Sequence, residues 1–224
     1  MALPTHLQGA IVDLDGTMVD TLGDFTVALN AALGELSLPA LSPGAIANLV
    51  GKGSEHLIRS ALQACGGPPD LYEAAWEGYQ RHYEAVNGQH ARVYPGVQEG
   101  LDTLQRAGLP LACVTNKPTR FARELLDRMH LGASFRYVFG GDAFERKKPD
   151  PFPLLQACKA LDAEPRRTLV VGDSSNDAAA ARAAGCPVVL VTYGYNHGQP
   201  VRTLDADGFV DSLAGLGRLL SAGG

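Results

Sequence analysis

The stretch AIVDLDGTMVD, residues 10–20, places two acidic side chains directly after an apolar run. Side chains alternate between the two faces of a strand, so we expect Asp13 and Asp15 on one face and Leu14 on the other. Two carboxylates that close repel each other unless a proton or a cation lies between them. Gly16 allows the chain to turn sharply or to approach a ligand closely. The stretch therefore predicts a carboxylate pair at the end of a buried strand, suited to a divalent cation, with a plain Asp-Gly turn as the alternative.

The length and composition indicate a folded protein with enough apolar residues for a substantial core. At about 150 residues per domain, 224 residues make one domain with a large insertion or two modest domains. A hydrophobic content of 46% and a charged content of 19% exclude an intrinsically disordered chain. The net charge of −5 argues against bulk binding to nucleic acid or to an anionic membrane, but not against a small anionic substrate.

The chain has none of the usual signals for secretion, membrane insertion or zinc binding. Its first ten residues have neither a basic patch nor an apolar core of signal-peptide length, and no apolar run is long enough to span a membrane. The cysteines at positions 65, 113, 158 and 186 lack the CxxC spacing of zinc sites. These features predict a cytoplasmic protein with reduced thiols and no membrane partner.

Residues from about 20 to 90 have a helical pattern throughout. Apolar residues recur at helical spacing from Leu22 onward, in a short helix over 45–50, around Leu57 and from Leu71 to Val86. The sequence Gly-Gly-Pro-Pro at 66–69 separates two of these segments. The pattern predicts a small all-helical domain that is inserted after the first strand, with its aromatic residues in the core.

From residue 94 onward, helical segments alternate with short apolar runs. Continuous apolar strands between helices predict an α/β protein with a parallel sheet that is covered on both faces. We assign residues 1–19 and 91–224 to this core and residues 20–90 to the inserted helical domain. The expected strands cover 109–115, 137–139, 168–172, 187–191 and 209–210, and the expected helices 97–106, a segment after Pro118, 151–161, 178–184 and 213–220.

Polar residues follow several of these strands at the points where the strands end. Thr115 and Asn116 follow the second strand, and GDSSND at 172–177 follows the strand that ends at Gly172. Lys147 and Lys148 come shortly after the strand at 137–139. Each group alone is typical of a helix cap or of a solvated surface. Because the carboxyl ends of parallel strands share one edge of the sheet, their joint placement predicts a ligand site there.

The residue types at this edge fit phosphoryl transfer. An aspartate attacks phosphorus without a general base, and Asp13 is the natural nucleophile because it comes first after the strand. Asp15 would give a proton to the leaving alkoxide and later take one from the hydrolytic water. Thr115, the backbone amide of Asn116 and Lys148 would hold phosphate oxygens, with Lys148 balancing charge during the attack.

The same edge has the oxygen ligands that Mg²⁺ prefers. Mg²⁺ takes about six oxygens, usually from one or two carboxylates, waters and phosphate. Asp13, the carbonyl oxygen of Asp15 and Asp173 would supply the protein ligands. Asp177, one helical turn beyond Asp173, would act as a further metal-site residue by orienting a metal-bound water.

These residues together resemble the haloacid dehalogenase superfamily of phosphatases. The resemblance covers the whole chain and implies a Rossmann-like parallel sheet core with an inserted, mobile, all-helical cap. It also implies that Asp13 is the nucleophile, that Asp15 is the acid/base, and that both bind Mg²⁺ together with Asp173. The matching motifs are DLDGT at 13–17, the strand-end Thr115, KKP at 147–149 and GDSSND at 172–177.

Within this superfamily the chain is most similar to bacterial phosphoglycolate phosphatases. The resemblance implies hydrolysis of 2-phosphoglycolate to glycolate and phosphate by a cytoplasmic monomer or homodimer. Ser175 stands where that subgroup is expected to have an arginine, and Met18 replaces a leucine. The supporting stretches are VGKG at 50–53, VTNKP at 114–118, KKPDPFPLL at 147–155 and TYGYN at 192–196.

Phosphoglycolate carries a second anion, its carboxylate, which needs a positive partner opposite the phosphate. The loop Gly51-Lys52-Gly53 has a lysine between glycines and free amides at a helix start. We expect this loop to close over the carboxylate, and the alternative is a surface lysine in a turn.

Other functions share parts of this residue pattern. A general sugar-phosphate phosphatase or a phosphomutase would use the same two aspartates. A haloacid dehalogenase would leave Asp15 without a purpose, and a phosphonate hydrolase would need a cap lysine such as Lys52 as a Schiff base. A phospho-acceptor switch domain is the non-enzymatic alternative, but such domains lack both the second aspartate and the helical insertion.

Overall fold

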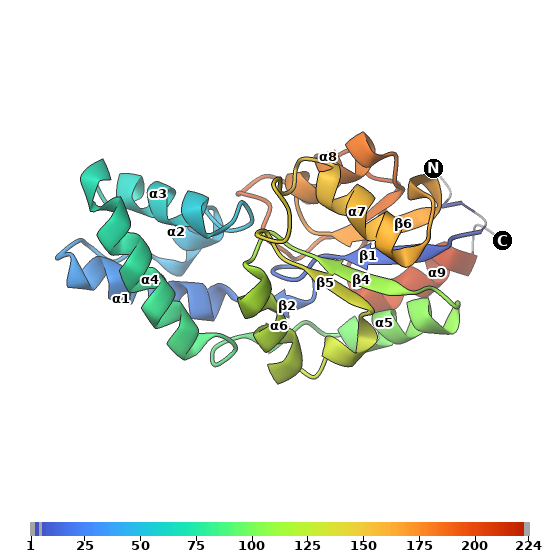
Figure 1. Cartoon of the computed structure of the whole chain (residues 1–224), viewed down its shortest axis with the longest axis horizontal. Helices are drawn as coiled ribbons and strands as arrows, with labels where there is room; N and C mark the ends of the chain where they lie inside the picture. The colour runs from blue at the N-terminus through green and yellow to red at the C-terminus, as the bar shows by residue number, and fades with distance from the viewer. Residues whose placement is uncertain (1–2, 5, 222–224) are drawn as a thin grey trace.

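A parallel sheet forms the centre of the computed structural model, which describes residues 3–4 and 6–221. Its six strands lie in the order β5-β4-β1-β6-β7-β8, and every neighbouring pair is parallel (Figure 1). The predicted α/β class with a parallel sheet is therefore confirmed. The strands are Gly9–Val12 (β1), Leu111–Val114 (β4), Tyr137–Phe139 (β5), Thr168–Gly172 (β6), Val188–Val191 (β7) and Gly208–Val210 (β8).

The inner strands are almost entirely apolar because helices cover both faces of the sheet. Strands β1, β4, β6 and β7 are completely buried. Val12 packs in a cluster with residues of α5, α6 and α9, whereas its neighbour Ile11 faces α7 and α8 on the other side. These helices are Val97–Arg106 (α5), Thr119–Arg128 (α6), Phe152–Leu161 (α7), Ser175–Ala184 (α8) and Leu216–Ser221 (α9).

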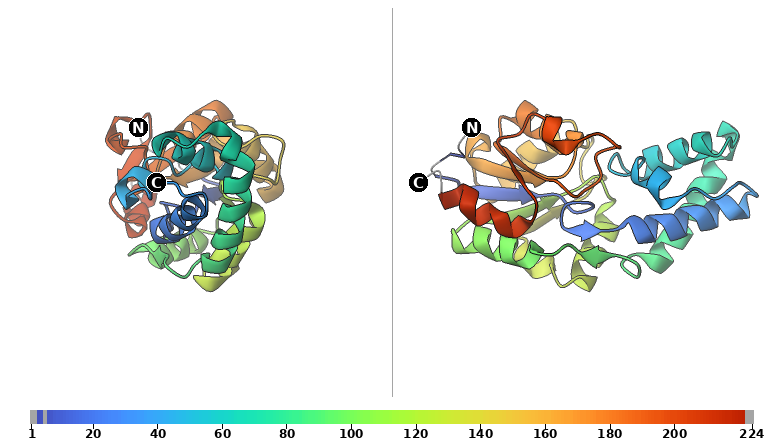
Figure 2. Two further views of the ribbon diagram at one scale, coloured as in Figure 1. Left: turned by 90° about the vertical axis from the view of Figure 1, so that its left-hand side faces the viewer. Right: turned by 180° about the vertical axis from the view of Figure 1, so that it is seen from behind.

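The chain between β1 and β4 contains a separate group of helices, as the sequence predicts. Figures 1 and 2 show this group at the end of the molecule opposite the chain termini. The helices pack around a shared cluster that includes Phe25, Leu29, Tyr79 and Tyr83. Within the described residues, no helix combines the length and the apolar character needed to cross a bilayer. The group consists of Leu22–Glu35 (α1), Pro43–Ala47 (α2), Ser54–Ala64 (α3) and Tyr72–Val86 (α4).

A short antiparallel strand pair joins the helical group to the sheet. Val19–Asp20 (β2) pairs with Arg92–Val93 (β3), so the outgoing and returning chains lie side by side. The backbone N–H of Tyr94 extends the pairing by donating to the carbonyl of Met18 at 3.0 Å. The sequence analysis missed this pair because two residues are too few to produce a periodic pattern.

A few predicted boundaries differ from the observed ones. The helix expected at 178–184 begins at Ser175, and the short helix expected at 45–50 is Pro43–Ala47. The C-terminal segment expected as one helix is a 3₁₀ turn followed by α9. The 3₁₀ turns are Pro69–Leu71, Gly132–Ser134, Pro165–Arg167, Val201–Thr203 and Leu213–Gly215.

Candidate active site

The turn after β1 folds directly against the turn after β6. The backbone N–H of Asp13 donates to the carbonyl of Val171 at 2.9 Å, which ties the two strand ends together. Gly16 has a φ of +82°, and a Cβ added there would lie 2.2 Å from Oδ2 of Asp173. Only glycine suits both this backbone conformation and this close approach. The hydroxyl of Thr17 donates to Oδ1 of Asp173 at 3.0 Å and fixes that carboxylate.

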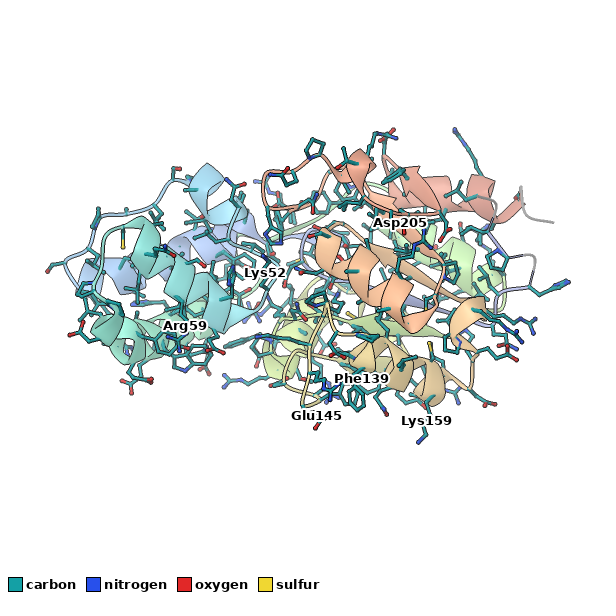
Figure 3. All side chains as sticks on the ribbon, turned by 90° about the horizontal axis from the view of Figure 1, so that it is seen from above. Lys52, Arg59, Phe139, Glu145, Lys159 and Asp205 are labelled. Atoms are coloured by element: carbon teal, nitrogen blue, oxygen red, sulfur yellow. The ribbon has the colours of Figure 1, made fainter. Side chains whose placement is uncertain are left out.

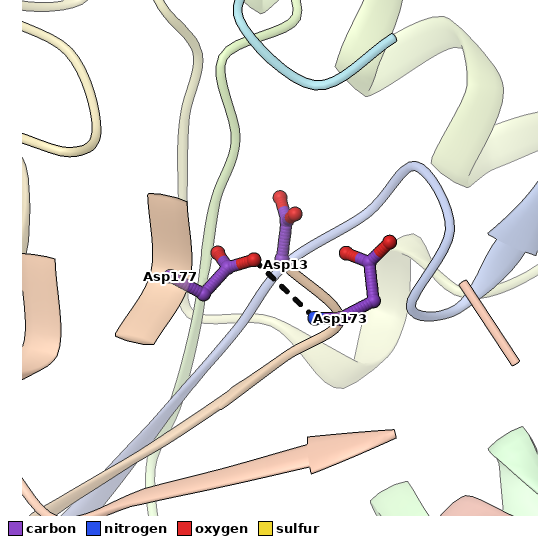
Figure 4. A group of neighbouring side chains, drawn as sticks. All are labelled: Asp13, Asp173 and Asp177. Atoms are coloured by element: carbon purple, nitrogen blue, oxygen red, sulfur yellow. Dashed lines mark hydrogen bonds between the residues drawn. The ribbon is translucent and has the colours of Figure 1, made fainter. Parts of the chain in front are cut away.

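Three carboxylates meet at this edge of the sheet. Asp13, Asp173 and Asp177 each place one oxygen within 4.8 Å of the others (Figure 4). Burial raises the pKa of Asp13 to about 7, while Lys148 opposes this shift and Asp177 adds to it. Burial, together with the charges of Asp177 and Asp13, also raises the pKa of Asp173. The carboxylates therefore repel one another in their charged forms, and a bound cation would reduce this repulsion.

Lys148 lies inside this cluster. Its buried ammonium donates to the carbonyl of Val114 at 2.7 Å and to Oδ1 of Asp177 at 2.8 Å. It forms an ion pair at 2.8 Å with Oδ1 of Asp13. Burial alone would lower the pKa of Lys148, but the two carboxylates outweigh it and the pKa is raised. Lys148 thus stays charged beside Asp13. Its neighbour Lys147, which the sequence also places after β5, lines an outer groove.

Asp177 holds the start of α8 as well as Lys148. Its Oδ2 accepts the hydroxyl of Ser174 at 2.7 Å and the N–H of Ser174 at 3.1 Å. It also accepts the N–H of Asp173 at 3.3 Å, the dashed line in Figure 4. This capping arrangement explains why α8 begins at Ser175. That Asp177 orients a metal-bound water stays a prediction. The contacts of Asp177 indicate that this residue also positions Lys148.

The donor set fits a hard divalent cation. The three clustered carboxylates include two, Asp13 and Asp177, that pair with the single ammonium of Lys148, so an excess of negative charge is left in a buried place. Within the described part of the chain, Oδ1 of Asp13 has no well-aligned hydrogen-bond donor, although Lys148 lies near it. Carboxylate oxygens at this spacing, with room for further oxygen ligands, are what Mg²⁺ and similar cations take in proteins.

Thr115 and Asn116 lie at the same edge, at the end of β4. The hydroxyl of Thr115 is buried and accepts the N–H of Lys117 at 3.2 Å. The side-chain amide of Asn116 donates to the carbonyl of Lys148 at 2.8 Å and to that of Gly51 at 2.9 Å. Asn116 therefore links the end of β4 to the loop between α2 and α3. The structure brings both residues to the cavity that the acids line.

Asp15 has its own cationic partner, which the sequence analysis missed. Its Oδ1 accepts a hydrogen bond from Nζ of Lys117 at 3.0 Å. The Lys117 side chain is only 2% exposed and also donates to the hydroxyl of Tyr83 on α4 at 2.5 Å. The only signal in the sequence was the position of this lysine directly after Thr115 and Asn116. A lysine before a proline at a helix start is usually a surface residue, so the pattern did not reveal its burial.

The loop at 51–53, which is predicted to contact the substrate, has its two glycines on the cavity beside the acids and its lysine on an outer groove. Gly51 and Gly53 line the enclosed cavity. Lys52 is exposed and lines the outer groove with Arg59 and Lys147, and Figure 3 shows it where the helical group meets the rest of the chain. The expected contact between Lys52 and a substrate stays a prediction.

Tyr195, also missed from the sequence, connects the acidic cluster to the first helix of the helical group. Its N–H donates to Oδ2 of Asp173 at 2.6 Å. Its hydroxyl donates to Asp20 and accepts the N–H groups of Thr21 and Leu22, each at 3.0 Å. The stretch TYGYN contributed to the family resemblance, but no spacing rule placed this side chain near an acid 22 residues away.

The cavity itself is small and is closed by the helices. Its walls include the acids on one side and the apolar side chains of Phe25, Leu57, Tyr79 and Phe121 on the other. Its volume is about 30 Å³, enough for one or two water molecules. A phosphorylated substrate needs more room than this cavity has in the conformation described.

Comparison with known proteins supports the resemblance found in the sequence. The family model for haloacid dehalogenase-like hydrolases matches residues 10–191. A phosphoglycolate phosphatase of Nitrosospira multiformis is 44% identical, with 95% of each chain covered. A plasmid-encoded phosphoglycolate phosphatase of Cupriavidus necator is 43% identical, covering 94% of this chain and 92% of its own.

A solved structure agrees with the sequence matches. The crystal structure of a predicted phosphoglycolate phosphatase from Haemophilus somnus has a TM-score of 0.90 and 32% identity, with 95% of this chain and 97% of that chain covered. The prediction of a phosphatase-type enzyme is confirmed by these relatives. The chain belongs to the haloacid dehalogenase-like hydrolase family.

Proposed function

We propose that this chain is a Mg²⁺-dependent phosphomonoester hydrolase that converts 2-phosphoglycolate to glycolate and phosphate. The observation that carries the proposal is the position of Asp13. It lies 2.8 Å from Lys148 and within one acidic cluster with Asp173, at the strand edge where Asp15 also lies. The relatives named phosphoglycolate phosphatase match over nearly the whole chain and support the substrate.

Asp13, Asp15 and Lys148 each have a part in the proposed reaction. Asp13 attacks the phosphorus, an acyl phosphate forms, and the bond from phosphorus to the ester oxygen breaks. Asp15, which must be protonated when this step begins, gives that proton to the ester oxygen as glycolate leaves. Asp15 then takes a proton from a water molecule that attacks the phosphorus, which releases phosphate and restores Asp13. Lys148 balances the charge of the phosphoryl oxygens in both steps.

The metal would be held by residues of two strand ends. Asp13, Asp173 and the carbonyl oxygen of Asp15 are the proposed protein ligands. When bound, Mg²⁺ supplies positive charge against the phosphoryl oxygens and lowers the repulsion between them and Asp13. Thr115 and the backbone amide of Asn116 complete the binding of the phosphate on the side of Lys148.

We also propose that residues 20–90 form a cap domain over a core of residues 1–19 and 91–224. The four helices share a hydrophobic cluster of their own, and the two chain crossings lie together in the β2–β3 pair. The cavity is enclosed by side chains from both parts, so the helices are suited to excluding water during phosphoryl transfer.

The cavity favours a small substrate over a sugar phosphate. Its helical wall is mainly aromatic and aliphatic and has few groups that could bond several sugar hydroxyls. A site with apolar walls leaves such hydroxyls without partners, which costs binding energy.

A panel of phosphate monoesters, assayed with Mg²⁺ for phosphate release, tests the proposed function. We expect 2-phosphoglycolate to have a kcat/KM at least tenfold above that of any sugar phosphate in the panel. A sugar phosphate that is preferred tenfold or more would instead make this chain a general sugar-phosphate phosphatase.

A further inference from the structure

Lys117 is a buried cation that no step of the proposed reaction uses. It lies between the end of β4 and the start of α6, and its side chain is only 2% exposed. Its ammonium contacts Asp15 at 3.0 Å and the hydroxyl of Tyr83 at 2.5 Å. It also lies 4.8 Å from the ring centroid of Phe25 and 4.6 Å from that of Tyr83. Burying an ammonium is costly, so this placement calls for a function.

The ammonium can still bind a ligand in the cavity. A lysine has three N–H donors, and Asp15 and Tyr83 accept two of them. Lys117 is among the side chains that line the cavity and, within the described residues, is the one lysine or arginine on that lining. Its surroundings on the helical side are aromatic, so an anion that enters would meet a positive charge that water screens poorly.

The position of Lys117 relative to the reacting groups matches the shape of the substrate. Asp15 must lie beside the ester oxygen to protonate it, and Lys117 is the immediate neighbour of Asp15. In phosphoglycolate the carboxylate carbon is two bonds from that oxygen. The phosphate is held at the other end, by Lys148 beside Asp13. A carboxylate that projects from the ester oxygen toward the helices would therefore come within reach of Lys117.

We propose that Lys117 is the specificity-determining residue that binds the carboxylate of a small phosphorylated carboxylic acid. The inference rests on the proposed function and deepens it. It assigns to Lys117 the task that the sequence alone suggested for Lys52. Lys52 is exposed and faces the outer groove, whereas Lys117 lies inside the cavity beside the proposed acid/base.

The test compares two substrates that differ only in the second anion. One is 2-phosphoglycolate, and the other is its neutral amide, phosphoglycolamide. The ratio of their kcat/KM values is measured for the wild-type protein and for Lys117→Met, which removes the charge but keeps an unbranched side chain. Lys117→Gln is measured in parallel, because it retains a hydrogen-bond donor near Asp15 and guards against a packing defect in the first variant. Lys159→Met is the matched control, since Lys159 is an exposed lysine on α7, outside the cavity.

We expect both Lys117 variants to lower the ratio at least thirtyfold, mainly through a higher KM for phosphoglycolate, and Lys159→Met to leave it unchanged. Equal losses on both substrates would mean that Lys117 only positions Asp15, and the inference would be wrong. A ratio that falls in Lys52→Met instead of the Lys117 variants would overturn it as well. A wild-type ratio near one would refute the proposed substrate itself, whereas a high wild-type ratio that the Lys117 variants retain would refute the inference alone.

Discussion

At the scale of single residues, the site has two separate groups of ion pairs, one around each buried lysine. Lys148 pairs with Asp13 and Asp177, and Lys117 pairs with Asp15. Each of the two aspartates with a proposed chemical role therefore has its own lysine. With separate lysines, the proposed nucleophile Asp13 can act on the phosphorus while the proposed acid Asp15 acts on the ester oxygen.

A first prediction concerns Asp177, which touches Lys148 and Ser174 through its two oxygens. We expect Asp177→Asn to lower kcat about 10–100-fold, because Lys148 loses a charged partner that positions it. The Mg²⁺ concentration for half-maximal activity should change less than threefold. The matched variant Asp173→Asn should raise that concentration at least tenfold. A larger metal requirement in Asp177→Asn than in Asp173→Asn would make Asp177 the stronger metal ligand and contradict this account.

The sequence allowed many of the clustered residues to be named, but not all. Asp13, Asp173 and Lys148 could be predicted because each belongs to a short motif directly at or after a strand. Lys117 could not, because its role depends on contact with Tyr83, 34 residues earlier in another part of the fold. Local patterns do not encode which lysine a distant helix will cover.

At the scale of secondary-structure elements, the parallel register brings the motifs together. Val12 pairs with Cys113 on β4 and with Val171 on β6, so the residues that follow all three strands leave the sheet at one edge. The loop between α2 and α3 then reaches this edge from the helical group. The carbonyl of Gly51 accepts hydrogen bonds from the side chains of Asn116 and Asn176 at 2.9 and 3.2 Å.

A second prediction concerns this loop. Gly51 has a φ of +111°, so Gly51→Ala forces an alanine into a backbone conformation that costs about 1–2 kcal/mol. We expect kcat/KM to fall about tenfold, because the loop loses the geometry that closes the cavity. Gly44→Ala is the control, since Gly44 lies in α2 with open space around it and alanine favours a helix there. Similar losses in the two variants, measured by phosphate release, would refute the role of the loop.

The elements themselves were largely predictable, for a physical reason. The core strands are buried on both faces, so each appears in the sequence as a continuous apolar run, and the helices between them have clear apolar periodicity. The β2–β3 pair was missed because its residues are few and its register depends on the fold around it. The start of α8 was placed too late because the capping by Ser174 and Asp177 outweighs the weak pattern of its first residues.

At the scale of the whole molecule, the buried acids link stability to pH and to metal. The pKa of Asp13 is about 7 in the folded protein and 3.8 in an unfolded chain, so the folded state binds more protons between these values. The contribution of this group to stability is therefore present below about pH 4 and is lost as the pH rises through about 7. Burial raises the pKa of Asp173 as well, which acts in the same direction.

A third prediction follows for the effect of Mg²⁺ on thermal unfolding. Because the cation competes with protons for the same carboxylates, Mg²⁺ should raise Tm more at pH 8 than at pH 5. We expect a difference of about 5 °C or more between the two shifts, each measured against the protein in EDTA at the same pH. In Asp13→Asn, which removes one of these titrating groups, the difference should shrink. A shift that is equal at both pH values, or larger at pH 5, would contradict a metal site built on these acids.

The central claim is that Asp13 is the nucleophile of a phosphoryl transfer, and the most direct measurement is the kcat/KM of Asp13→Asn for 2-phosphoglycolate with Mg²⁺. Circular dichroism must first show that the variant is folded, and Asp70→Asn at an exposed position serves as the control. The account predicts a loss of about 10⁴-fold or more in Asp13→Asn and no loss in the control. Hydrolysis by a folded Asp13→Asn protein at a rate within tenfold of the wild type would contradict it.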